Sequence, residues 1–345
     1  MLDWFTGIIG CDGSHLKADQ VCRIEPSGNV LWSSDCWIEC KGSYESSIAV
    51  RQRDLPVGLG VHERGNRLLQ ISGNPVKYLQ GHNAFGPSVS LYRPIVDATI
   101  RRLPNGVRPL DLSVGKLLDM WPSRLDIAVS IDMGSYANVK EWLRCIGTGS
   151  RSRHGRALVS GDTVYWGQHS RRWAMKAYCK YDEMKVHPMG DLLLNEQYRD
   201  EVQNVLRLEL CLRGLELKEI KKKGWLIDEK LVWKYFEDRI CIGRLNMSRV
   251  KNLEQLTLSQ QAIFLRWIGG EVIYDKLKES TFYRYRRAIL GNMGVDISIQ
   301  CTDQDTMMER MNFDVEYLKD HEIMTIPNIF NERLFEPETF AFSES

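Results

Sequence analysis

Apolar and polar residues alternate with a period of two over residues 124–130, 174–183 and 206–213. Alternation of this length predicts strands with one apolar and one polar face, because successive side chains of a strand point to opposite sides. The pattern is strongest in the third segment, where a leucine stands at every second position from Leu206 to Leu212. If the three strands pair in one sheet, their charged residues share one surface.

Strand patterns dominate the first part of the chain and helical patterns dominate the last part. Residues 1–87 are predicted to be rich in strands, beginning with an apolar strand at Met1–Gly10. Apolar stripes at helical spacing predict helices between the later strands, over residues 93–103, 138–146 and 192–202. Three more helices are predicted after Gly214, over residues 228–236, 259–267 and 280–290.

The order of these elements predicts the α+β class: an antiparallel sheet with flanking helices, followed by a smaller helical domain. The pattern changes near residues 215–224, where a basic segment leads into the helices. We therefore predict three parts, which are residues 1–220, residues 221–310 and a C-terminal tail at 311–345.

Composition narrows the classes of partner. The chain has 345 residues and a formal net charge of +1, so any contact with nucleic acid depends on local patches and not on a global field. Nine cysteines at irregular spacings, with no C-x-x-C pair, give poor support for a zinc site or a disulfide framework. No apolar run approaches the roughly 20 residues that span a bilayer, so no membrane partner is expected.

Tyr178 is the first candidate for chemistry. It stands between Lys176 and Lys180 on the predicted polar face of its strand. Tyrosine is a known covalent nucleophile, and neighbouring cations would lower the pKa of its phenol and offset phosphate charge. This pattern suits attack on phosphorus, with Tyr178 as nucleophile and Lys180 as a catalytic cation. The alternative is an exposed edge strand with solvated lysines.

Carboxylates on the same predicted face suggest a metal site. Asp126 and Glu209 would lie near Tyr178 if the three strands pair, and oxygen ligands of this kind suit Mg²⁺ or Mn²⁺. Glu183 and His82 are further candidate ligands. Ordinary structural roles stay open for each: a surface ion pair for Asp126, a cross-strand charge ladder for Glu209 and a turn position for His82.

Two basic segments are candidates for DNA contacts. Residues 147–156 are rich in Gly, Ser and Arg, which can hold a DNA backbone. The next segment places arginines between Trp166 and Trp173, as single-strand binding favours. The arginines in question are Arg151, Arg153, Arg156, Arg171 and Arg172. The alternatives are a flexible basic loop, and core tryptophans beside solvated arginines.

The predicted helix at 280–290 has Ser280 as a plausible N-cap and an apolar stripe. Off that stripe lie three residues suited to DNA: Tyr283, Arg284 and Arg287. With the preceding helix and the Gly269-Gly270 turn, the arrangement is similar to a helix-turn-helix reader of duplex DNA. A helical bundle with a basic surface is an equally good interpretation.

Several segments together resemble one family, the replication initiators of filamentous bacteriophages (the gene II product family). The most specific is residues 77–86, which is similar to that family's K-x-L-Q-G-H-N-x-F-G block. Four others resemble family segments in the same order along the chain: residues 123–128, 163–183, 206–209 and 280–285. The matches cover about residues 70–300, whereas the N-terminal strands match only loosely.

The resemblance implies an initiator of rolling-circle DNA replication, a metal-dependent endonuclease that nicks and later rejoins one strand at the phage origin. Tyr178 falls at the position of the family's nucleophile, which takes the 5′ phosphate and leaves a 3′ hydroxyl as primer. The implied fold is a nuclease domain like those of HUH and Rep proteins, with a helical domain that helps to recognise the origin. The chain lacks the His-hydrophobic-His triplet of the wider HUH superfamily, so its metal ligands rest on inference.

The resemblance also implies the partners of the protein and the compartment in which it acts. Its partners would be double-stranded and single-stranded DNA together with a host helicase and polymerase, in the cytoplasm of a bacterial host; an oligomer on DNA stays open. Two other functions remain to be separated from this one. One is a non-catalytic origin-binding or copy-control protein, and the other is a metal-dependent endonuclease that uses water as its nucleophile.

Overall fold

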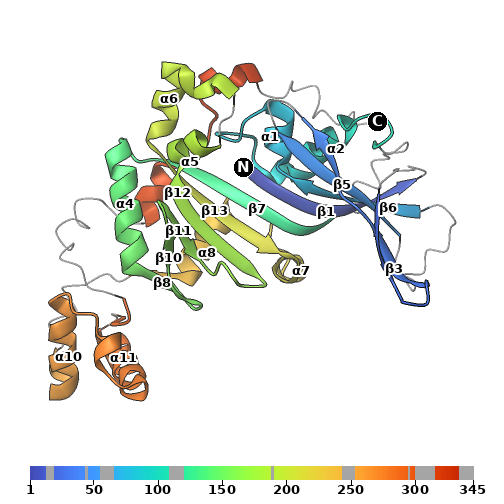
Figure 1. Cartoon of the computed structure of the whole chain (residues 1–345). Helices are drawn as coiled ribbons and strands as arrows, with labels where there is room; N and C mark the ends of the chain where they lie inside the picture. Colours follow the sequence, from blue (N-terminus) through green and yellow to red (C-terminus); the bar gives the residue numbers. More distant parts are fainter. Residues whose placement is uncertain are drawn as a thin grey trace.

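A nine-stranded antiparallel sheet forms the centre of the computed structural model (Figure 1), with the strand order β10-β11-β12-β13-β7-β1-β6-β5-β4. The structure describes residues 1–12, 19–42, 46–54, 66–108, 120–187, 190–242, 253–293, 296–299 and 315–333. The strands of the sheet are β1 (Leu2–Asp12), β4 (Ile38–Lys41), β5 (Ser47–Asp54), β6 (Asn66–Gly73), β7 (Trp121–Asp132), β10 (Leu158–Ser160), β11 (Thr163–Trp166), β12 (Trp173–Cys179) and β13 (Val205–Arg213).

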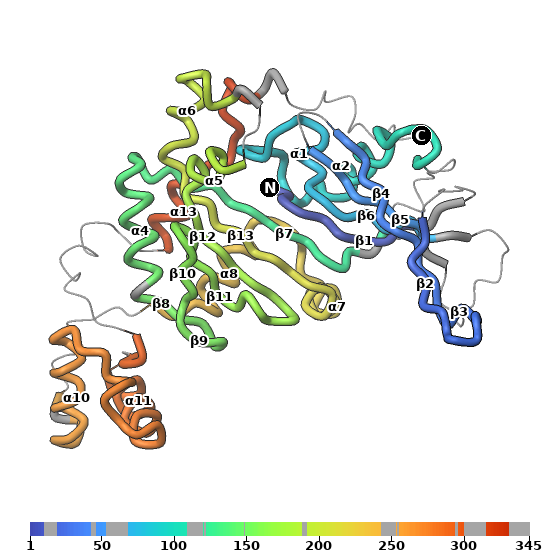
Figure 2. Tube along the Cα trace, in the orientation of Figure 1, coloured from blue at the N-terminus to red at the C-terminus, as the bar shows by residue number. Residues whose placement is uncertain are grey.

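Two smaller sheets accompany the main one. A hairpin of β2 (Gln20–Ile24) and β3 (Val30–Asp35) projects at the end of the main sheet that carries β4 and β5 (Figure 2). A three-stranded sheet joins β14 (Ile240–Ile242) to β8 (Ser150–Ser152), and β8 to β9 (Gly155–Arg156). The predicted class, α+β with an antiparallel sheet, is therefore confirmed.

Helices bury one face of the main sheet in a continuous apolar core. The helices near the sheet are α1 (Pro75–Gln80), α2 (Tyr92–Arg101), α4 (Tyr136–Gly149), α5 (Lys180–Val186), α6 (Glu196–Gln203), α7 (Gly214–Lys222) and α8 (Lys230–Arg239). Trp142 of α4 and Phe236 of α8 stack with ring centroids 6.4 Å apart, and both are buried in this core. Short 3-10 turns η1 (Val89–Leu91) and η2 (Gly190–Leu194) precede α2 and α6.

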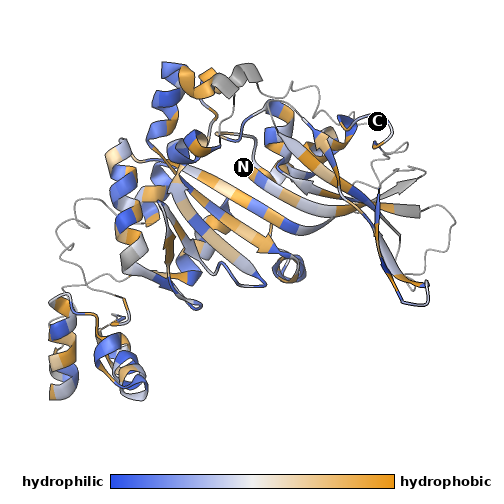
Figure 3. Cartoon of the chain, viewed as in Figure 1, coloured by the Kyte–Doolittle hydropathy of each residue, from blue (hydrophilic) through white to orange (hydrophobic). Residues whose placement is uncertain are grey.

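The predicted alternation of β13 is confirmed, and its hydropathy pattern is visible in Figure 3. Leu206, Leu208, Leu210 and Leu212 have no exposed surface. The other face of the strand is also shielded, because Arg207 and Glu209 are buried as well. A charge ladder on a solvated face, the alternative considered for Glu209, is therefore wrong.

The strand that carries Tyr178 is shorter than predicted. β12 ends at Cys179 and α5 begins at Lys180, so Lys180 and Asp182 lie on a helix and not on the strand. Asp182 and Glu183 lie in the first turn of this helix, where their negative charges interact favourably with the positive end of the helix dipole. The alternation of residue types at positions 180–183 therefore does not indicate a strand, because these residues belong to α5.

Helices α10 (Leu258–Ile268) and α11 (Glu279–Met293) form a separate apolar cluster around Phe264, Trp267 and Phe282. Figure 1 shows them set apart from the main sheet, at the end that carries β8. Two shorter turns, η3 (Leu253–Gln255) and η4 (Tyr274–Lys276), flank α10. The connection at residues 269–278 is longer than the three- to four-residue turn of a helix-turn-helix.

The packing does not follow the predicted division of the chain. Leu231 and Phe236 of α8 lie in the core of the main sheet, although residue 221 was the predicted start of the second domain. The second apolar cluster takes its first buried residue at Leu256. The exact boundaries 1–220, 221–310 and 311–345 thus stay a prediction, with the packing favouring a later start for the second part.

The predicted tail returns to the main sheet. It contains α13 (Val315–Asp320), labelled in Figure 2, and the turn η5 (Asn328–Arg333). The amide of Ile323 donates to the Ser130 carbonyl of β7, and Phe330 is buried. Among the described residues, no helix is both long enough and apolar enough to cross a membrane.

Replacement of a β13 leucine tests the core. Leu210→Ala should lower the free energy of unfolding by about 3 kcal/mol, because it removes buried methyl groups and leaves a cavity. The measurement is urea denaturation followed by circular dichroism. Leu258→Ala is the matched control, since Leu258 is 83% exposed. Equal losses in the two variants would contradict the placement of β13 at the centre of the core.

Candidate active site

Tyr178 lies at the buried end of β12 and forms a hydrogen bond with its neighbour strand. Its hydroxyl donates to Oε1 of Glu209 on β13. The other carboxylate oxygen of Glu209, Oε2, is 2.7 Å from Nζ of Lys176. Lys176 stands directly opposite Glu209 in the strand register, and its Nζ is 4.9 Å from the centre of the Tyr178 ring. The predicted shared face thus exists, with Glu209 at its centre.

The pKa of Glu209 is unusual. Burial and the negative charge of Asp3 raise the pKa of its carboxyl to about 7, despite the ion pair with Lys176. Burial and the charge of Glu209 also raise the pKa of Tyr178 well above its usual value. The carboxyl group of Glu209 can therefore gain or lose a proton near neutral pH, whereas the neighbouring phenol of Tyr178 keeps its proton.

The expectation that two lysines lower the pKa of Tyr178 is wrong. The ammonium of Lys176 is engaged by Glu209, and Lys180 is turned away into the protein interior. Nζ of Lys180 lies 2.9 Å from Oδ1 of Asn83 and 2.7 Å from Oε2 of Glu183. Burial lowers the pKa of Lys180, and its side chain has no exposed surface.

Asp3 was missed by the sequence analysis. It lies on β1 at a register shift between Leu2 and Trp4, an irregularity that can re-aim a side chain toward a site. Its Oδ1 accepts hydrogen bonds from Nδ2 of Asn83 at 2.8 Å and Nδ2 of Asn74 at 3.2 Å. The one signal in the sequence is a lone carboxylate inside the apolar N-terminal strand.

Lysine and arginine charges surround Asp3. Burial alone would raise the pKa of its carboxyl, but the charges of Lys176, Lys180 and Arg207 outweigh burial and hold that pKa below its usual range. Asp3 thus stays ionised. Since its charge also acts on Glu209, the two carboxylates form one electrostatic unit.

The loop at residues 81–86 braces this unit. Arg207 is fully buried and donates to the carbonyls of Asn83 and Ala84. The side chain of Asn83 then bridges Asp3 and Lys180. The segment predicted to hold a metal ligand is therefore a support for the site.

The structure does not bring together the four predicted metal ligands. Asp126 faces the same side as Glu209, but Arg124 holds it through two hydrogen bonds of 2.9 and 2.6 Å. His82 is fully buried, with its ring 5.3 Å from that of Phe330. Glu183 pairs with Lys180, as described above. Within the described residues, no three His, Cys, Asp or Glu side chains form a metal-binding group.

A cavity of about 360 Å³ opens beside Tyr178. Its walls come from β11, β12 and α5, and it is lined by Asp162, Thr163, Tyr165, Lys176, Tyr178, Cys179, Asp182, Glu183, Val186 and His187. Asp182 is fixed in this wall by three partners: the Tyr136 hydroxyl at 3.1 Å, Lys140 at 3.0 Å and Lys185 at 2.7 Å. Tyr178 thus forms part of the wall of this cavity, although its side chain is largely buried.

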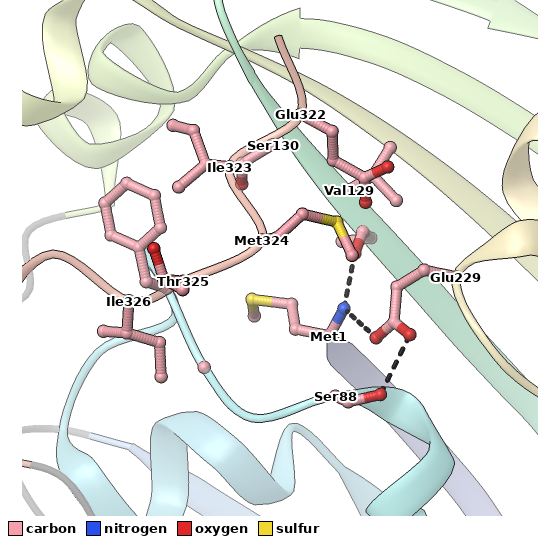
Figure 4. A pocket seen from close by; sticks show the side chains of 13 residues that line it. Met1, Ser88, Val129, Ser130, Glu229, Glu322, Ile323, Met324, Thr325 and Ile326 are labelled. Atoms are coloured by element: carbon pink, nitrogen blue, oxygen red, sulfur yellow. Dashed lines mark hydrogen bonds and ion pairs between the residues drawn. The ribbon is translucent and has the colours of Figure 1, made fainter. Parts of the chain in front are cut away.

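A second, smaller cavity of about 130 Å³ lies at the start of β1 (Figure 4). There the Met1 nitrogen donates to the Ala128 carbonyl at 2.6 Å and to Oε1 of Glu229 at 2.9 Å. Oε2 of Glu229 accepts from the Ser88 hydroxyl at 2.9 Å. None of the predicted site residues lines this cavity, and its contacts join β1 to β7 and to the start of α8.

Three predicted DNA-binding arginines are engaged within the protein. Arg151 contacts the Ser298 hydroxyl and lies 3.4 Å from Asp296, and Arg156 donates to the Ser298 carbonyl at 3.0 Å. Arg172 pairs with Glu216 at 2.6 Å.

The other predicted DNA-binding residues are exposed. Arg153 and Arg171 lie in exposed turns, and α11 presents Tyr283, Arg284 and Arg287 to solvent. A DNA-binding role for all of these residues stays a prediction.

Comparison with known proteins now identifies the family. A family model that describes the N-terminal part of the replication-associated protein known as the gene II product matches residues 1–268. This chain belongs to that family. It is 28% identical over 314 residues to the replication-associated protein of the same kind from Enterobacteria phage I2-2, with 87% of this chain and 88% of the relative covered.

A solved structure of a rolling circle replication initiator protein from Geobacillus stearothermophilus is also similar. The match has 12% identity and a TM-score of 0.33, and it covers 71% of this chain and 86% of that one. At this level the likeness supports no conclusion about this chain.

Membership of the gene II product family confirms the resemblance drawn from the motifs, and with it a function in replication.

Removal of the Asp3 charge tests the electrostatic unit. Asp3→Asn should lower the pKa of Glu209 below about 7, because one cause of the raised value is the charge of Asp3. Carbon-13 carboxyl shifts of labelled glutamate, followed over a pH titration, measure this value. Asp200→Asn, a change in exposed helix α6, is the control. An unchanged pKa in Asp3→Asn would show that Asp3 and Glu209 are not coupled.

Proposed function

We propose that this member of the gene II product family nicks one strand of origin DNA through a covalent intermediate on Tyr178. The observation that carries the proposal is the hydrogen bond from the Tyr178 hydroxyl to Glu209, at the wall of an open cavity. A nucleophile within hydrogen-bonding reach of a base, which a third group orients, is the arrangement that activates weak hydroxyl nucleophiles. Here Lys176 is the third group.

The chemistry follows from the raised pKa values. Since burial keeps the proton on Tyr178, attack requires an acceptor, and Oε1 of Glu209 takes the proton as the phenolic oxygen forms its bond to phosphorus. The bond from phosphorus to the 3′ oxygen breaks, and that oxygen takes a proton from water and leaves as the hydroxyl of the primer end. The phosphodiester is exchanged for a phosphotyrosine of similar energy, so the reverse attack by a 3′ hydroxyl can reseal a strand.

The two lysines have different roles in this proposal. Lys176 is 38% exposed, lines the cavity and is positioned to offset charge on the scissile phosphate. Lys180 is fully buried, so we assign it a positioning role through Asn83 and Glu183 in place of the direct catalytic role first predicted.

We assign the divalent cation to Asp3, whose carboxylate stays ionised, and leave Glu209 as the base. Mg²⁺ is usually held by one or two carboxylates, with water and substrate phosphate completing its shell, so Asp3 would hold the ion together with the phosphate. When bound, such an ion, Mg²⁺ or Mn²⁺, would polarise the phosphate. Asp126, Glu183 and His82 keep the protein contacts described above.

The site also indicates which partners the protein would bind. The cavity would receive the single strand to be cut, and the exposed face of α11 with Tyr283, Arg284 and Arg287 would contact duplex DNA at the origin. The 3′ primer end requires a polymerase and a helicase of the bacterial host, in whose cytoplasm the reaction would take place.

Removal of the nucleophile should separate cutting from binding. Tyr178→Phe should abolish nicking of supercoiled phage replicative-form DNA and the covalent adduct, because it removes the attacking oxygen, while DNA binding persists. Denaturing electrophoresis and mass spectrometry of tryptic peptides measure nicks and adduct, and gel shift measures binding.

Tyr198→Phe is the control for that experiment, because Tyr198 packs against Phe330 away from the cavity. Full nicking by Tyr178→Phe would refute the proposed nucleophile. Nicks without any adduct in the unmodified protein would instead favour water as the nucleophile.

Glu209 should set the pH dependence of nicking. The base must be deprotonated to accept a proton, so the nicking rate should rise with pH through about 7. Glu209→Gln should remove this inflection and slow nicking about 100-fold or more. Single-turnover rates from pH 5 to 9 measure both effects, with Glu219→Gln as the control. A retained inflection in Glu209→Gln would assign the titration to another group.

A further inference from the structure

Tyr165 is an aromatic residue in the cavity that the mechanism above does not use. It lies on β11 directly opposite Lys176 and is half-buried. Within the described residues, its side chain forms no ring contact and no hydrogen bond. Tyr136 and Tyr181 differ from it, because their rings pack edge to face with centroids 5.9 Å apart.

The strand register places the side chain of Tyr165 close to that of Tyr178. Directly opposite residues of an antiparallel pair have Cβ atoms about 5 Å apart, and diagonal neighbours lie about 7–8 Å apart. Tyr165 is thus next to Lys176 and diagonal to Tyr178, on the same face of the sheet. One nucleotide can bridge this span between the scissile phosphate and the ring.

The cavity has the shape and chemistry for one nucleobase. Its volume of about 360 Å³ lies in the range of small-molecule sites and is far below that of a duplex groove. Thr163 and His187 line the same cavity as Tyr165, and their hydroxyl and imidazole groups can form hydrogen bonds with the edge of a base. Stacking on an aromatic ring serves every base, because each has a π-face.

We propose that this cavity binds one unpaired nucleotide adjacent to the scissile phosphate, with its base stacked on Tyr165 and its edge read by Thr163 and His187. The proposal rests on the proposed function, since it assumes that the phosphate lies at Tyr178. A site of this kind would select an unpaired strand at the point of cleavage. This selection would be separate from any recognition of duplex DNA by α10 and α11.

The test uses a probe whose fluorescence falls when its base stacks. Oligothymidylate with 2-aminopurine at every second position is titrated into the Tyr178→Phe protein, which cannot cleave it. Binding should quench the fluorescence. Adding Tyr165→Ala should weaken binding about 10-fold and remove most of the quenching, whereas Tyr165→Phe should keep both, because the ring is retained.

Two further variants complete the design. Thr163→Phe should fill the cavity and also weaken binding, which guards against the chance that Tyr165→Ala fails to fold. Trp32→Ala is the control, because it removes an exposed aromatic ring on the distant hairpin β2–β3 and should change nothing.

The outcomes separate this proposal from the function on which it rests. Undiminished binding and quenching in both Tyr165→Ala and Thr163→Phe would overturn the nucleotide site, and so would equal losses in Tyr165→Ala and Tyr165→Phe. In parallel, the chain with Tyr178 intact is tested for a DNA adduct on the Tyr178 peptide. An adduct with no Tyr165 effect would leave the proposed function standing, whereas absence of an adduct would count against the function itself.

Discussion

The site depends on one buried carboxylate. Burying the charge of Glu209 costs free energy unless partners compensate it, and the pKa of about 7 shows that the compensation is incomplete. The Tyr178 hydroxyl and the Lys176 ammonium each take one of its oxygens. A carboxylate held in this partly compensated state binds a proton near neutral pH, which is the property that a general base requires.

The pairing of β12 with β13 makes this arrangement. The register places Lys176 opposite Glu209 and Tyr178 opposite Arg207, so a slip of one residue would move every member of the site to the other face. The leucines of β13 oppose such a slip, because it would expose them and bury charges in their place. The apolar core thus holds the register of β12 and β13, and the same residues that stabilise the fold position the candidate site.

Features that depend on periodicity could be predicted from the sequence, whereas features that depend on irregularity could not. Alternation predicted the strands of Tyr178 and Glu209 and their shared face. It misplaced Lys180, because nothing in a period-two pattern shows where a strand becomes a helix. It also gave no sign of Asp3, whose direction depends on a register shift in β1. The engagement of Arg151 by Asp296 joins residues far apart in the sequence, which no local pattern could reveal.

The most specific motif of the chain, residues 77–86, supports the candidate site through its hydrogen bonds. Gly81 ends α1 with a positive φ of 86°, which suits glycine and turns the chain toward the sheet. The side-chain amide of Gln80 closes the next loop by donating to the Phe85 carbonyl at 2.7 Å. Within this loop Asn83 joins Asp3 to Lys180, so a change to the loop would act on the carboxylates through position alone. His82 is buried in the same loop and packs against Phe330, and its role as a metal ligand stays a prediction.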